Sequence, residues 1–425
     1  MKNVKIVILP VAVALLLSAC NAAPKKSYIT LANPEDTSML TENCKAYIDA
    51  MREQEKSLAN PYKYSDLFGE SGVNVENFLD QGTVDGQNKT VSNGKPDRSD
   101  KNMGINLSFS IEEGHEAEEY KVLVSDNKNF ENAKEYVVKE NSLNVKNLFV
   151  NTEYYWKVIA GEEESNVGSF TTGNYPRWIS NRPMYNIRDN GGYMTISGQR
   201  VKQGLVYRGG EITNKAWGEH TLTKTEESKA VFRNEMKMVG GVELDLRGAS
   251  DIGDGYKACA FAEDGDIEYA QCPIKSYEQT FTVQADNKIK PRDMVKKIFE
   301  EVLAHADEHH VYYHCYGGAD RTGTIGFLLN GLLGVSYTDL VIDFELTSYS
   351  SINNEHIRSH IPGHQHQYDR WPALINQIKT DTTGGYAWDD EALLKDNIYN
   401  FLNKACSVPT ETLDQIRNIM LEPAK

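Results

Sequence analysis

Apolar and polar residues alternate in several short runs between residues 105 and 172. The clearest runs are residues 107–111, 120–124 and 155–159, and turn-forming residues separate them. Alternation with a period of two places every second side chain on one face of a strand. The pattern therefore predicts an antiparallel β-sandwich in this part of the chain.

After residue 174 the apolar residues form short unbroken runs and then recur with a helical period. Residues 311–313 predict a buried strand, and residues 324–329 predict the first turns of an apolar helix. Residues 331–335 and 340–348 continue the helical pattern, and two packed helices are expected on either side of Pro409. This order predicts an α/β domain with a central, mostly parallel sheet flanked by helices.

The first residues have the parts of a secretory signal. Lys2 and Lys5 precede an apolar run over residues 6–17, which ends in Leu-Ser-Ala-Cys with Cys20 last. The run is shorter than the roughly 20 residues that cross a bilayer. Its end resembles a bacterial lipoprotein cleavage box, which implies that Cys20 is acylated and becomes the first mature residue. Ordinary signal cleavage, with Cys20 left as a thiol, is the alternative.

Residues 20–100 carry weaker signals. Thr41 and Glu42 predict the start of a short amphipathic helix that reaches Leu58, whereas residues 82–100 are polar and rich in turn formers. The expected organisation has four parts: a lipoprotein signal peptide over 1–19, a tether with a short helix and a polar linker over 20–100, the sandwich over 101–173 and the α/β domain over 174–425.

The chain is strongly acidic. Its formal net charge is −16, and loss of Lys2 and Lys5 with the signal takes the charge to −18. This balance favours solubility and argues against nucleic acid as a partner. An anionic ligand would need a local basic island, and four arginines are the candidates: Arg188, Arg208, Arg247 and Arg321.

Cysteines and histidines outside the main motif give weak signals. Cys259 and Cys272 flank an acidic loop that a disulfide could close in an oxidising envelope, and two independent thiols are the alternative. His356 and His360 have a helical spacing, but no general-base motif accompanies them. Residues 356–366 are therefore expected to be solvated, and no metal site is expected.

The most informative segment is residues 314–323, His-Cys-Tyr-Gly-Gly-Ala-Asp-Arg-Thr-Gly. It places the thiol of Cys315 six residues before the guanidinium of Arg321, between an expected strand and an expected helix. At a helix N-terminus the free N–H groups and the helix dipole favour a thiolate and a bound oxyanion. Such a place can lower a cysteine pKa from about 8.5 to near neutrality. The pattern predicts a loop that wraps around a phosphate.

This segment resembles the signature loop of the protein tyrosine phosphatase superfamily at every fixed position of His-Cys-x-x-Gly-x-x-Arg-Ser/Thr-Gly. Residues 186–193 and 204–210 are similar to the opening of the bacterial tyrosine/lipid phosphatase subfamily, with Asn190 and Gly209 in place of its leucine and serine. Residues 241–247 end in Asp-Leu-Arg, as in the same subfamily. The resemblance covers the chain from about residue 180 to the C-terminus.

The resemblance implies hydrolysis of phosphomonoesters through a phosphocysteine intermediate, without metal or organic cofactor. Cys315 would attack phosphorus, Arg321 would grip two phosphate oxygens, and loop N–H groups would hold the others. Thr322 would donate its hydroxyl to the sulfur, and His314 would brace the loop. The expected phosphate-binding residues are Tyr316, Gly317, Gly318, Ala319, Arg321 and Thr322. The expected supporting residues are His314, Arg188, Asp189, Arg208, Asp245 and Arg247.

The general acid, which protonates the leaving oxygen, has several candidates. Asp320 is the first, because some related phosphatases use the aspartate immediately before the arginine. Asp286, before the next expected helix, is the alternative, and Asp251 and Asp254 follow. Ala319 stands where phosphoinositide-specific members commonly carry lysine, so phosphotyrosine or another small phosphomonoester is expected rather than an inositol lipid.

The sandwich carries a second resemblance. Leu148, Thr152 and Tyr154 are spaced as in the tyrosine-corner segment of fibronectin type III domains, with Val150 where proline is usual. This implies that Tyr154 hydrogen-bonds to the connection just upstream and locks the two sheets there. A spacer or orienting role is expected for the sandwich.

The expected protein is a lipoprotein of the cell envelope, periplasmic or on the cell surface, that hydrolyses phosphorylated peptides or small phosphomonoesters. The alternatives are a phosphoinositide or inositol-phosphate phosphatase of the same fold, a rhodanese-type sulfurtransferase and a catalytically weak phosphate-binding or adhesion lipoprotein. The sandwich supplies no residue to the expected chemistry, so a chain that begins near Tyr175 is expected to keep catalysis on small substrates. The sequence predicts no oligomeric state.

Overall fold

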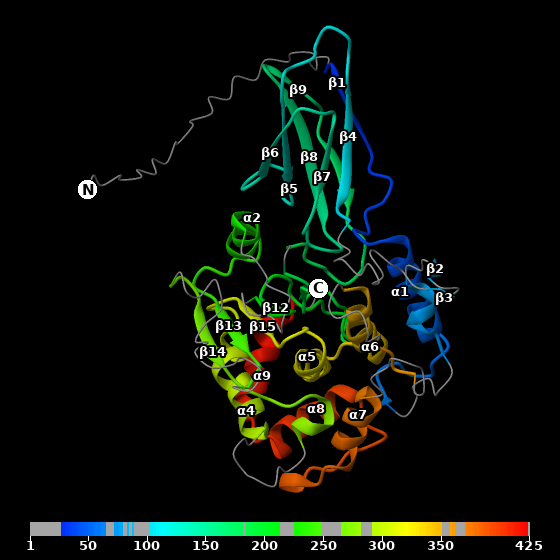
Figure 1. Ribbon diagram of the computed structural model, residues 1–425, viewed down its shortest axis with the longest axis vertical. Helices are drawn as coiled ribbons and strands as arrows, with labels where there is room; N and C mark the ends of the chain where they lie inside the picture. The colour runs from blue at the N-terminus through cyan, green and yellow to red at the C-terminus, as the bar shows by residue number, and fades with distance from the viewer. Residues whose placement is uncertain are drawn as a thin grey trace, which may run out of the picture.

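An all-β body and an α/β body make up the described part of the chain (Figure 1). The computed structural model describes residues 27–64, 72–79, 83–84, 87–88, 103–181, 184–212, 225–248, 265–281, 291–350, 358–361 and 370–423. The expected signal peptide and Cys20 lie outside these residues. No helix within them has both the length and the hydropathy that crossing a bilayer requires.

The all-β body is a sandwich of two antiparallel sheets around one core. One sheet has the order β1-β4-β7, and the other has the order β10-β8-β5-β6 with β9 beside β8. Buried residues alternate with more exposed ones along β4 and β8, as the sequence pattern predicts. The strands are β1 (Ile29–Ala32), β4 (Ile105–Ile111), β5 (Tyr120–Ser125), β6 (Lys134–Val138), β7 (Ser142–Val145), β8 (Glu153–Ala160), β9 (Glu163–Glu164) and β10 (Gly168–Thr171). A separate small hairpin pairs β2 (Thr83–Val84) with β3 (Gln87–Asn88).

The expected contact of Tyr154 is present in the sandwich. The backbone N–H of Phe149 donates to the Tyr154 hydroxyl at 3.0 Å, and the Tyr154 ring is buried. The hydroxyl therefore ties the start of β8 to the connection before it, which confirms this one prediction. The wider likeness to fibronectin type III domains stays a prediction.

The α/β body contains a five-stranded sheet of order β11-β12-β15-β13-β14. The last four strands run parallel, and β11 is antiparallel to β12. Gly209, His314 and Asp245 lie side by side in register, so β12, β15 and β13 end at the same edge. The strands are β11 (Arg188–Asp189), β12 (Val206–Gly209), β13 (Val242–Asp245), β14 (Glu268–Gln271) and β15 (Val311–His314).

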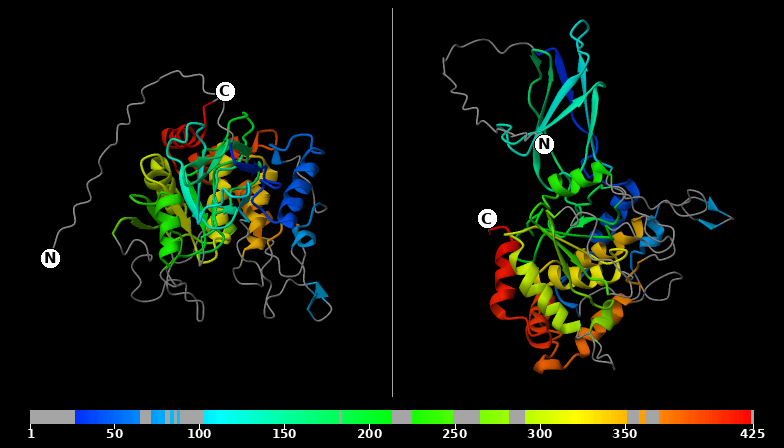
Figure 2. Two further views of the ribbon diagram at one scale, coloured as in Figure 1. Left: turned by 90° about the horizontal axis from the view of Figure 1, so that it is seen from above. Right: turned by 60° about the vertical axis from the view of Figure 1, so that its left-hand side comes forward.

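Both faces of this sheet are covered (Figure 2). Tyr312 packs on one face with Phe232, whereas Val311 and Tyr313 belong to the larger core on the other face. The helices are α2 (Glu226–Ala230), α4 (Pro291–Lys297), α5 (Asp320–Leu333), α6 (Tyr337–Glu345), α7 (Arg370–Thr380), α8 (Leu394–Asn400) and α9 (Thr410–Met420). Short helical turns accompany them: η3 (Val231–Glu235), η5 (Tyr277–Thr280), η6 (Ile298–Val302), η7 (Leu303–His305), η8 (Leu346–Tyr349), η9 (Thr383–Gly385) and η10 (Phe401–Ala405). The predicted α/β class is confirmed, as are the helices on either side of Pro409.

The segment before the sandwich corrects the predicted organisation. Helix α1 (Glu42–Glu55) begins as expected, with the Thr41 hydroxyl accepting from the N–H of Cys44, and the turn η2 (Val75–Phe78) follows it. However, the apolar face of α1 is fully buried in the core of the α/β body, beside α6 (Figure 1). Strand β1 pairs with β4 of the sandwich. These residues are therefore not a tether, and the chain passes between the two bodies three times.

The turn before β8 joins the sandwich to the α/β body. The side-chain amide of Gln203 accepts from the N–H of Val150 at 2.8 Å and donates to its carbonyl at 3.0 Å. The Arg177 guanidinium donates to the carbonyls of Leu148 at 3.1 Å and Asn147 at 2.8 Å. Because these contacts involve buried backbone groups, the sandwich is seated on the α/β body rather than linked to it by chain alone.

A chain that begins at Tyr175 is expected to lose its cooperative fold, contrary to the prediction from sequence. The deletion removes Tyr47, Ile48 and Met51, which are fully buried in the α/β core. Burial of one such side chain contributes about 1.5–3 kcal/mol, and a whole domain has only about 5–15 kcal/mol of stability. Urea unfolding followed by circular dichroism measures the effect.

A chain that begins at Ser27 is the matched control, because it keeps both β1 and α1. It should unfold with the midpoint of the full chain. An unchanged midpoint for the chain that begins at Tyr175 would show that α1 contributes nothing to the α/β body.

Candidate active site

Cys315 lies where β15 ends and α5 begins, at the edge where the parallel strands have their carboxyl ends. Ligands bind at this edge in open α/β sheets. The first turn of α5 adds backbone N–H groups and the positive end of a 14-residue helix. The loop predicted from the sequence is therefore where its chemistry requires it.

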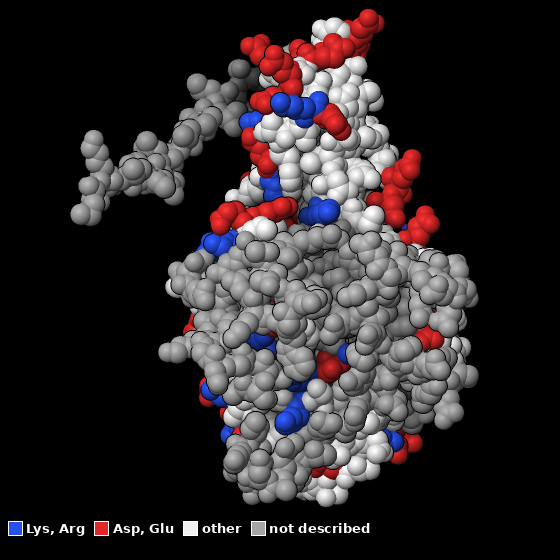
Figure 3. All heavy atoms as spheres, in the orientation of Figure 1, with Lys and Arg blue, Asp and Glu red and all other residues white. Residues whose placement is uncertain are grey.

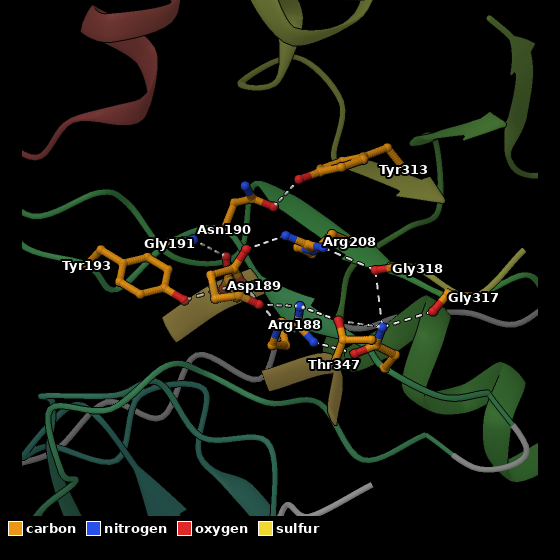
Figure 4. Close-up of polar contacts among 12 residues, drawn as sticks. Arg188, Asp189, Asn190, Gly191, Tyr193, Arg208, Tyr313, Gly317, Gly318 and Thr347 are labelled. Carbon is orange, nitrogen blue, oxygen red and sulfur yellow. Dashed lines mark hydrogen bonds and ion pairs between the residues drawn. The ribbon is translucent and has the colours of Figure 1, made fainter. Parts of the chain in front are cut away.

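The carbonyl groups from Cys315 to Gly318 each lie within hydrogen-bond distance of a side-chain donor. The Cys315 carbonyl is 3.0 Å from Nδ1 of His314, and the Tyr316 carbonyl accepts from the Tyr185 hydroxyl at 3.1 Å. The amide of Asn186 donates to the carbonyls of Gly317 and Gly318 at 2.9 and 3.1 Å. Figure 4 shows the carbonyl of Gly318 turned toward the side chain of Arg208 as well.

This arrangement fixes the direction of the loop N–H groups. In a trans peptide unit the N–H points opposite to the carbonyl of the preceding residue. The N–H groups from Tyr316 to Ala319 therefore point away from the outer donors and toward the centre of the loop. No described residue accepts from the N–H of Gly317, Gly318 or Ala319. Gly318 is also required sterically, since its φ is +64° and an added Cβ would lie 2.3 Å from backbone of Gly209.

The thiol of Cys315 has a lowered pKa. Burial alone would raise the pKa of this thiol, but the charge of Arg321 and the hydroxyl of Thr322 favour the thiolate and outweigh it. The Thr322 hydroxyl is buried and has no other hydrogen-bond partner among the described residues. Cys315, Arg321 and Thr322 are thus brought together as the sequence predicts.

Cys315 is expected to react with iodoacetamide at neutral pH before the buried thiols of Cys272 and Cys406 do. Its lowered pKa keeps thiolate present below the ordinary thiol pKa of about 8.5, and the rate should fall only as the pH drops through that lowered value. Burial instead raises the pKa of Cys272 to about 11 and that of Cys406 to about 12. Peptide mass mapping after timed alkylation measures the order.

Alkylation in denaturant is the control. Unfolding gives all thiols similar environments, so the cysteines should then react at similar rates. In the folded chain, Arg321→Gln should shift the alkylation of Cys315 to higher pH. Modification of Cys272 or Cys406 ahead of Cys315 would contradict the assignment.

Three of the four arginines proposed as a basic island are unavailable to a ligand. Arg188 and Arg208 are fully buried and form ion pairs with the two oxygens of Asp343. Arg208 also donates to the Gly318 carbonyl at 3.1 Å. Buried guanidinium groups need such partners, so these side chains brace the loop. Among these four arginines, Arg321 is the one that is partly exposed. Acidic side chains gather on the sandwich (Figure 3).

A second buried charge network surrounds His314. Its Nε2 is 2.7 Å from Glu243, and the carboxylates of Glu243 and Asp245 raise the pKa of the imidazole although burial opposes this. Arg247 bonds to both Asp245 and Glu211 and is buried, which removes it from the proposed island. The network fixes the ends of β13 and β15 beside the loop.

Asp189 has a structural role in β11, the edge strand at the opposite end of the sheet from β14. It pairs with buried Arg177 at 2.7 Å and accepts from the N–H groups of Gly191 and Gly204, each at 2.7 Å. Tyr313 of β15 donates to Asn190 at 3.0 Å (Figure 4). These bonds hold the turn that precedes β12.

Asp320, the first candidate for the general acid, is the first residue of α5 and is partly exposed. Its Oδ1 accepts from the Tyr277 hydroxyl at 2.9 Å and from Nη2 of Arg358 at 2.8 Å. The other candidates, Asp286, Asp251 and Asp254, lie outside the described residues.

The weaker motifs have mixed outcomes. Cys272 is a free buried thiol, in line with the alternative of two independent thiols, and Cys259 lies outside the described residues. His360 is buried and bonds to Glu345 at 2.7 Å, so it is not on a solvated surface as expected. Within the described residues, no group of three or more His, Cys, Asp or Glu side chains could hold a metal ion.

Sequence reasoning missed several residues that complete the site. Asp343 and Glu243 each interrupt an apolar run, and a charge in such a place signals a buried partner. Arg358 lies in a polar stretch without any distinguishing pattern, so no sequence signal could have placed it beside Asp320.

Comparison with known proteins identifies one family. The profile of the tyrosine phosphatase family matches residues 179–422. Among solved structures, the chain is similar to the core catalytic domain of the PP-IP phosphatase SIW14 from S. cerevisiae in complex with citrate. That match has 16% sequence identity and a TM-score of 0.24, and it covers 37% of this chain and 75% of that chain. No curated protein matches the chain.

Proposed function

Because the family profile spans more than half of its residues, the chain belongs to the tyrosine phosphatase family, and we propose that it is a cysteine-dependent phosphomonoesterase. The observation that carries this proposal is the loop of Cys315. A thiol with a lowered pKa lies beside N–H groups that point into the same space, next to Arg321. A thiolate within a ring of donors is suited to attack a bound phosphate dianion.

In the first step, Sγ of Cys315 forms a bond to phosphorus while the bond from phosphorus to the leaving oxygen breaks. Asp320 gives its proton to that oxygen, so a neutral alcohol departs and a carboxylate remains. The loop N–H groups and Arg321 stabilise the charge on the three phosphoryl oxygens throughout.

In the second step, water attacks phosphorus, and the Asp320 carboxylate takes one of its protons. The bond from phosphorus to Sγ breaks, and the departing thiolate again benefits from the hydroxyl of Thr322 and the charge of Arg321. Inorganic phosphate leaves, and the carboxyl and thiolate are restored. No metal or organic cofactor is part of this proposal.

Phosphotyrosine peptides or other small phosphomonoesters are the proposed substrates. Ala319 supports this choice, since a loop that must also bind an inositol ring with several phosphates would gain from a cation at this position. The sandwich is proposed as a spacer or orienting module.

Turnover of para-nitrophenyl phosphate tests the proposed function. The purified chain that begins at Ser27 is expected to release nitrophenolate in the presence of EDTA, and orthovanadate should inhibit it by occupying the loop. A requirement for added metal would contradict the thiolate mechanism.

We also propose that an acyl group on Cys20 anchors the chain in the cell envelope, on the basis of the Leu-Ser-Ala-Cys box. Cys20→Ala should abolish incorporation of labelled palmitate and leave the chain unprocessed or unanchored. Normal processing and anchoring of this variant would overturn the proposal.

A further inference from the structure

The two hydrogen bonds that Asp320 accepts both end on the same oxygen. Tyr277 and Arg358 donate to Oδ1, at 2.9 and 2.8 Å. Within the described residues, no donor contacts Oδ2, and the side chain is partly exposed. Two donors on one oxygen fix the plane of the carboxyl group and leave the other oxygen to carry a proton.

Tyr277 reaches Asp320 from a backbone conformation that bulky residues rarely adopt. Its φ is +45°, in the left-handed region, and its N–H donates to the hydroxyl of Thr324 at 3.0 Å. The ring is fully buried against Phe344. A conformation of this kind is unfavourable and persists only where the surroundings impose it, often at functional sites.

Arg358 is equally constrained. The hydroxyl of Ser348 accepts from its N–H at 2.8 Å and donates to its carbonyl at 3.1 Å. Ser348 is fully buried, and Arg358 is 6% exposed. Hydrogen bonds to both its N–H and its carbonyl therefore fix the backbone of Arg358, whose guanidinium reaches Asp320.

Glu345 binds the segment of residues 358–361, which carries Arg358. Its carboxylate accepts from both the N–H and Nδ1 of His360, and it also accepts from the hydroxyl of Tyr47 in α1. All three side chains are buried. Helices α1 and α6, which are distant in sequence, are thus bonded through Glu345 to the short segment that carries Arg358.

We propose that Arg358 is a positioning residue, which together with Tyr277 holds Oδ1 of Asp320 so that Oδ2 delivers the proton to the leaving oxygen. This inference rests on the proposed function, because it assigns a task only if Asp320 is the general acid. The proton moves from Oδ2 to the leaving oxygen as the phosphorus–oxygen bond breaks, and the resulting carboxylate keeps its bonds to Arg358 and Tyr277.

Substrates with different leaving groups test the proposal, because an acid matters most for a poor leaving group. Arg358→Gln should lower kcat for phosphotyrosine by about 10–100-fold, a part of the usual worth of acid catalysis, and should change hydrolysis of 2,4-dinitrophenyl phosphate much less. Arg358→Lys, which keeps the charge, should recover most of the loss. In an Asp320→Asn background, Arg358→Gln should have little further effect.

Equal losses on both substrates, or losses that multiply in the double variant, would overturn the positioning role. Should Arg358→Gln fail to fold, Tyr277→Phe removes the other bond to Oδ1 and keeps the ring. It should show a smaller loss with the same dependence on the leaving group, and a loss without that dependence would likewise overturn the role.

Arg292→Gln is the matched control, since Arg292 forms an ion pair with buried Asp381 and does not contact Asp320. It should leave the ratio of the two rates unchanged. Failure of the proposed function is distinguishable, because the unaltered chain would then hydrolyse neither substrate. If Asp320→Asn itself shows no dependence on the leaving group, the positioning role is rejected together with the acid assignment.

Discussion

Replacement of Cys315 by serine is expected to reduce phosphatase turnover to less than a few per cent while leaving the fold and phosphate binding nearly intact. A serine hydroxyl has a far higher pKa than this thiol, so the variant has no anionic nucleophile at neutral pH. The loop N–H groups, Arg321 and Thr322 all remain. Phosphate should bind at least as well, because the variant has lost a negative charge from the centre of the site. Steady-state rates and calorimetric titration with inorganic phosphate measure the two effects.

Cys272→Ser is the control for this substitution. Cys272 is a buried thiol whose pKa is raised to about 11, and it lies outside the loop. The control should keep full turnover. Appreciable turnover by Cys315→Ser would exclude a phosphocysteine intermediate and with it the proposed mechanism.

Replacement of Asp320 by asparagine is expected to slow phosphotyrosine hydrolysis by about 10²–10⁴-fold, the usual worth of general acid–base catalysis. The amide oxygen can still accept from Tyr277 and Arg358, so the change removes the proton and keeps both bonds. Hydrolysis of an activated aryl phosphate should slow much less, and the basic limb of the pH–rate profile should disappear. Rates on both substrates across pH give the measurement.

Asp286→Asn separates the two leading candidates. It should be mild on both substrates if Asp320 is the acid. If only Asp286→Asn shows a defect that depends on the leaving group, then Asp286 rather than Asp320 is the general acid. Equal slowing of both substrates by Asp320→Asn would instead mean that Asp320 serves only to hold a neighbouring guanidinium, and the structure places Arg358 in that position.

The loop was predictable because its function and its fold use the same few consecutive residues. A strand, a thiol, glycines, an arginine and an apolar helix follow one another within residues 311–333, so local pattern is sufficient to place them. Helix boundaries at Thr41 and Pro409 were predictable for the same reason, since capping and chain breaks are local.

The partners of the buried arginines could not be predicted in this way. Arg188 and Asp343 are 155 residues apart, and the sequence around either residue gives no signal that the other is its partner. The sequence therefore indicated that Arg188 and Arg208 matter, both as supporting residues and as members of a basic island for the ligand. Their burial excludes the place in the island, because a guanidinium in the interior must be matched by a carboxylate.

The misassigned tether has a related cause. Helix α1 is preceded by one short strand and followed by a polar, turn-rich stretch, which is the usual composition of a linker. What identifies α1 as part of the α/β core is the surface that covers Tyr47, Ile48 and Met51, and that surface is formed near the other end of the chain.

Helix α1 also sets an order for folding. Tyr47 and its partner Glu345 are 298 residues apart, and Arg52 and Asp339 are 287 residues apart. A chain made from its N-terminus presents the apolar face of α1 long before α6 exists, whereas the strands from β4 to β10 can pair as soon as they are complete. Contacts between such distant residues also form slowly. We therefore expect α1 to gain protection from hydrogen exchange after the sandwich does, and nascent chains to be most prone to aggregate in the interval between these events.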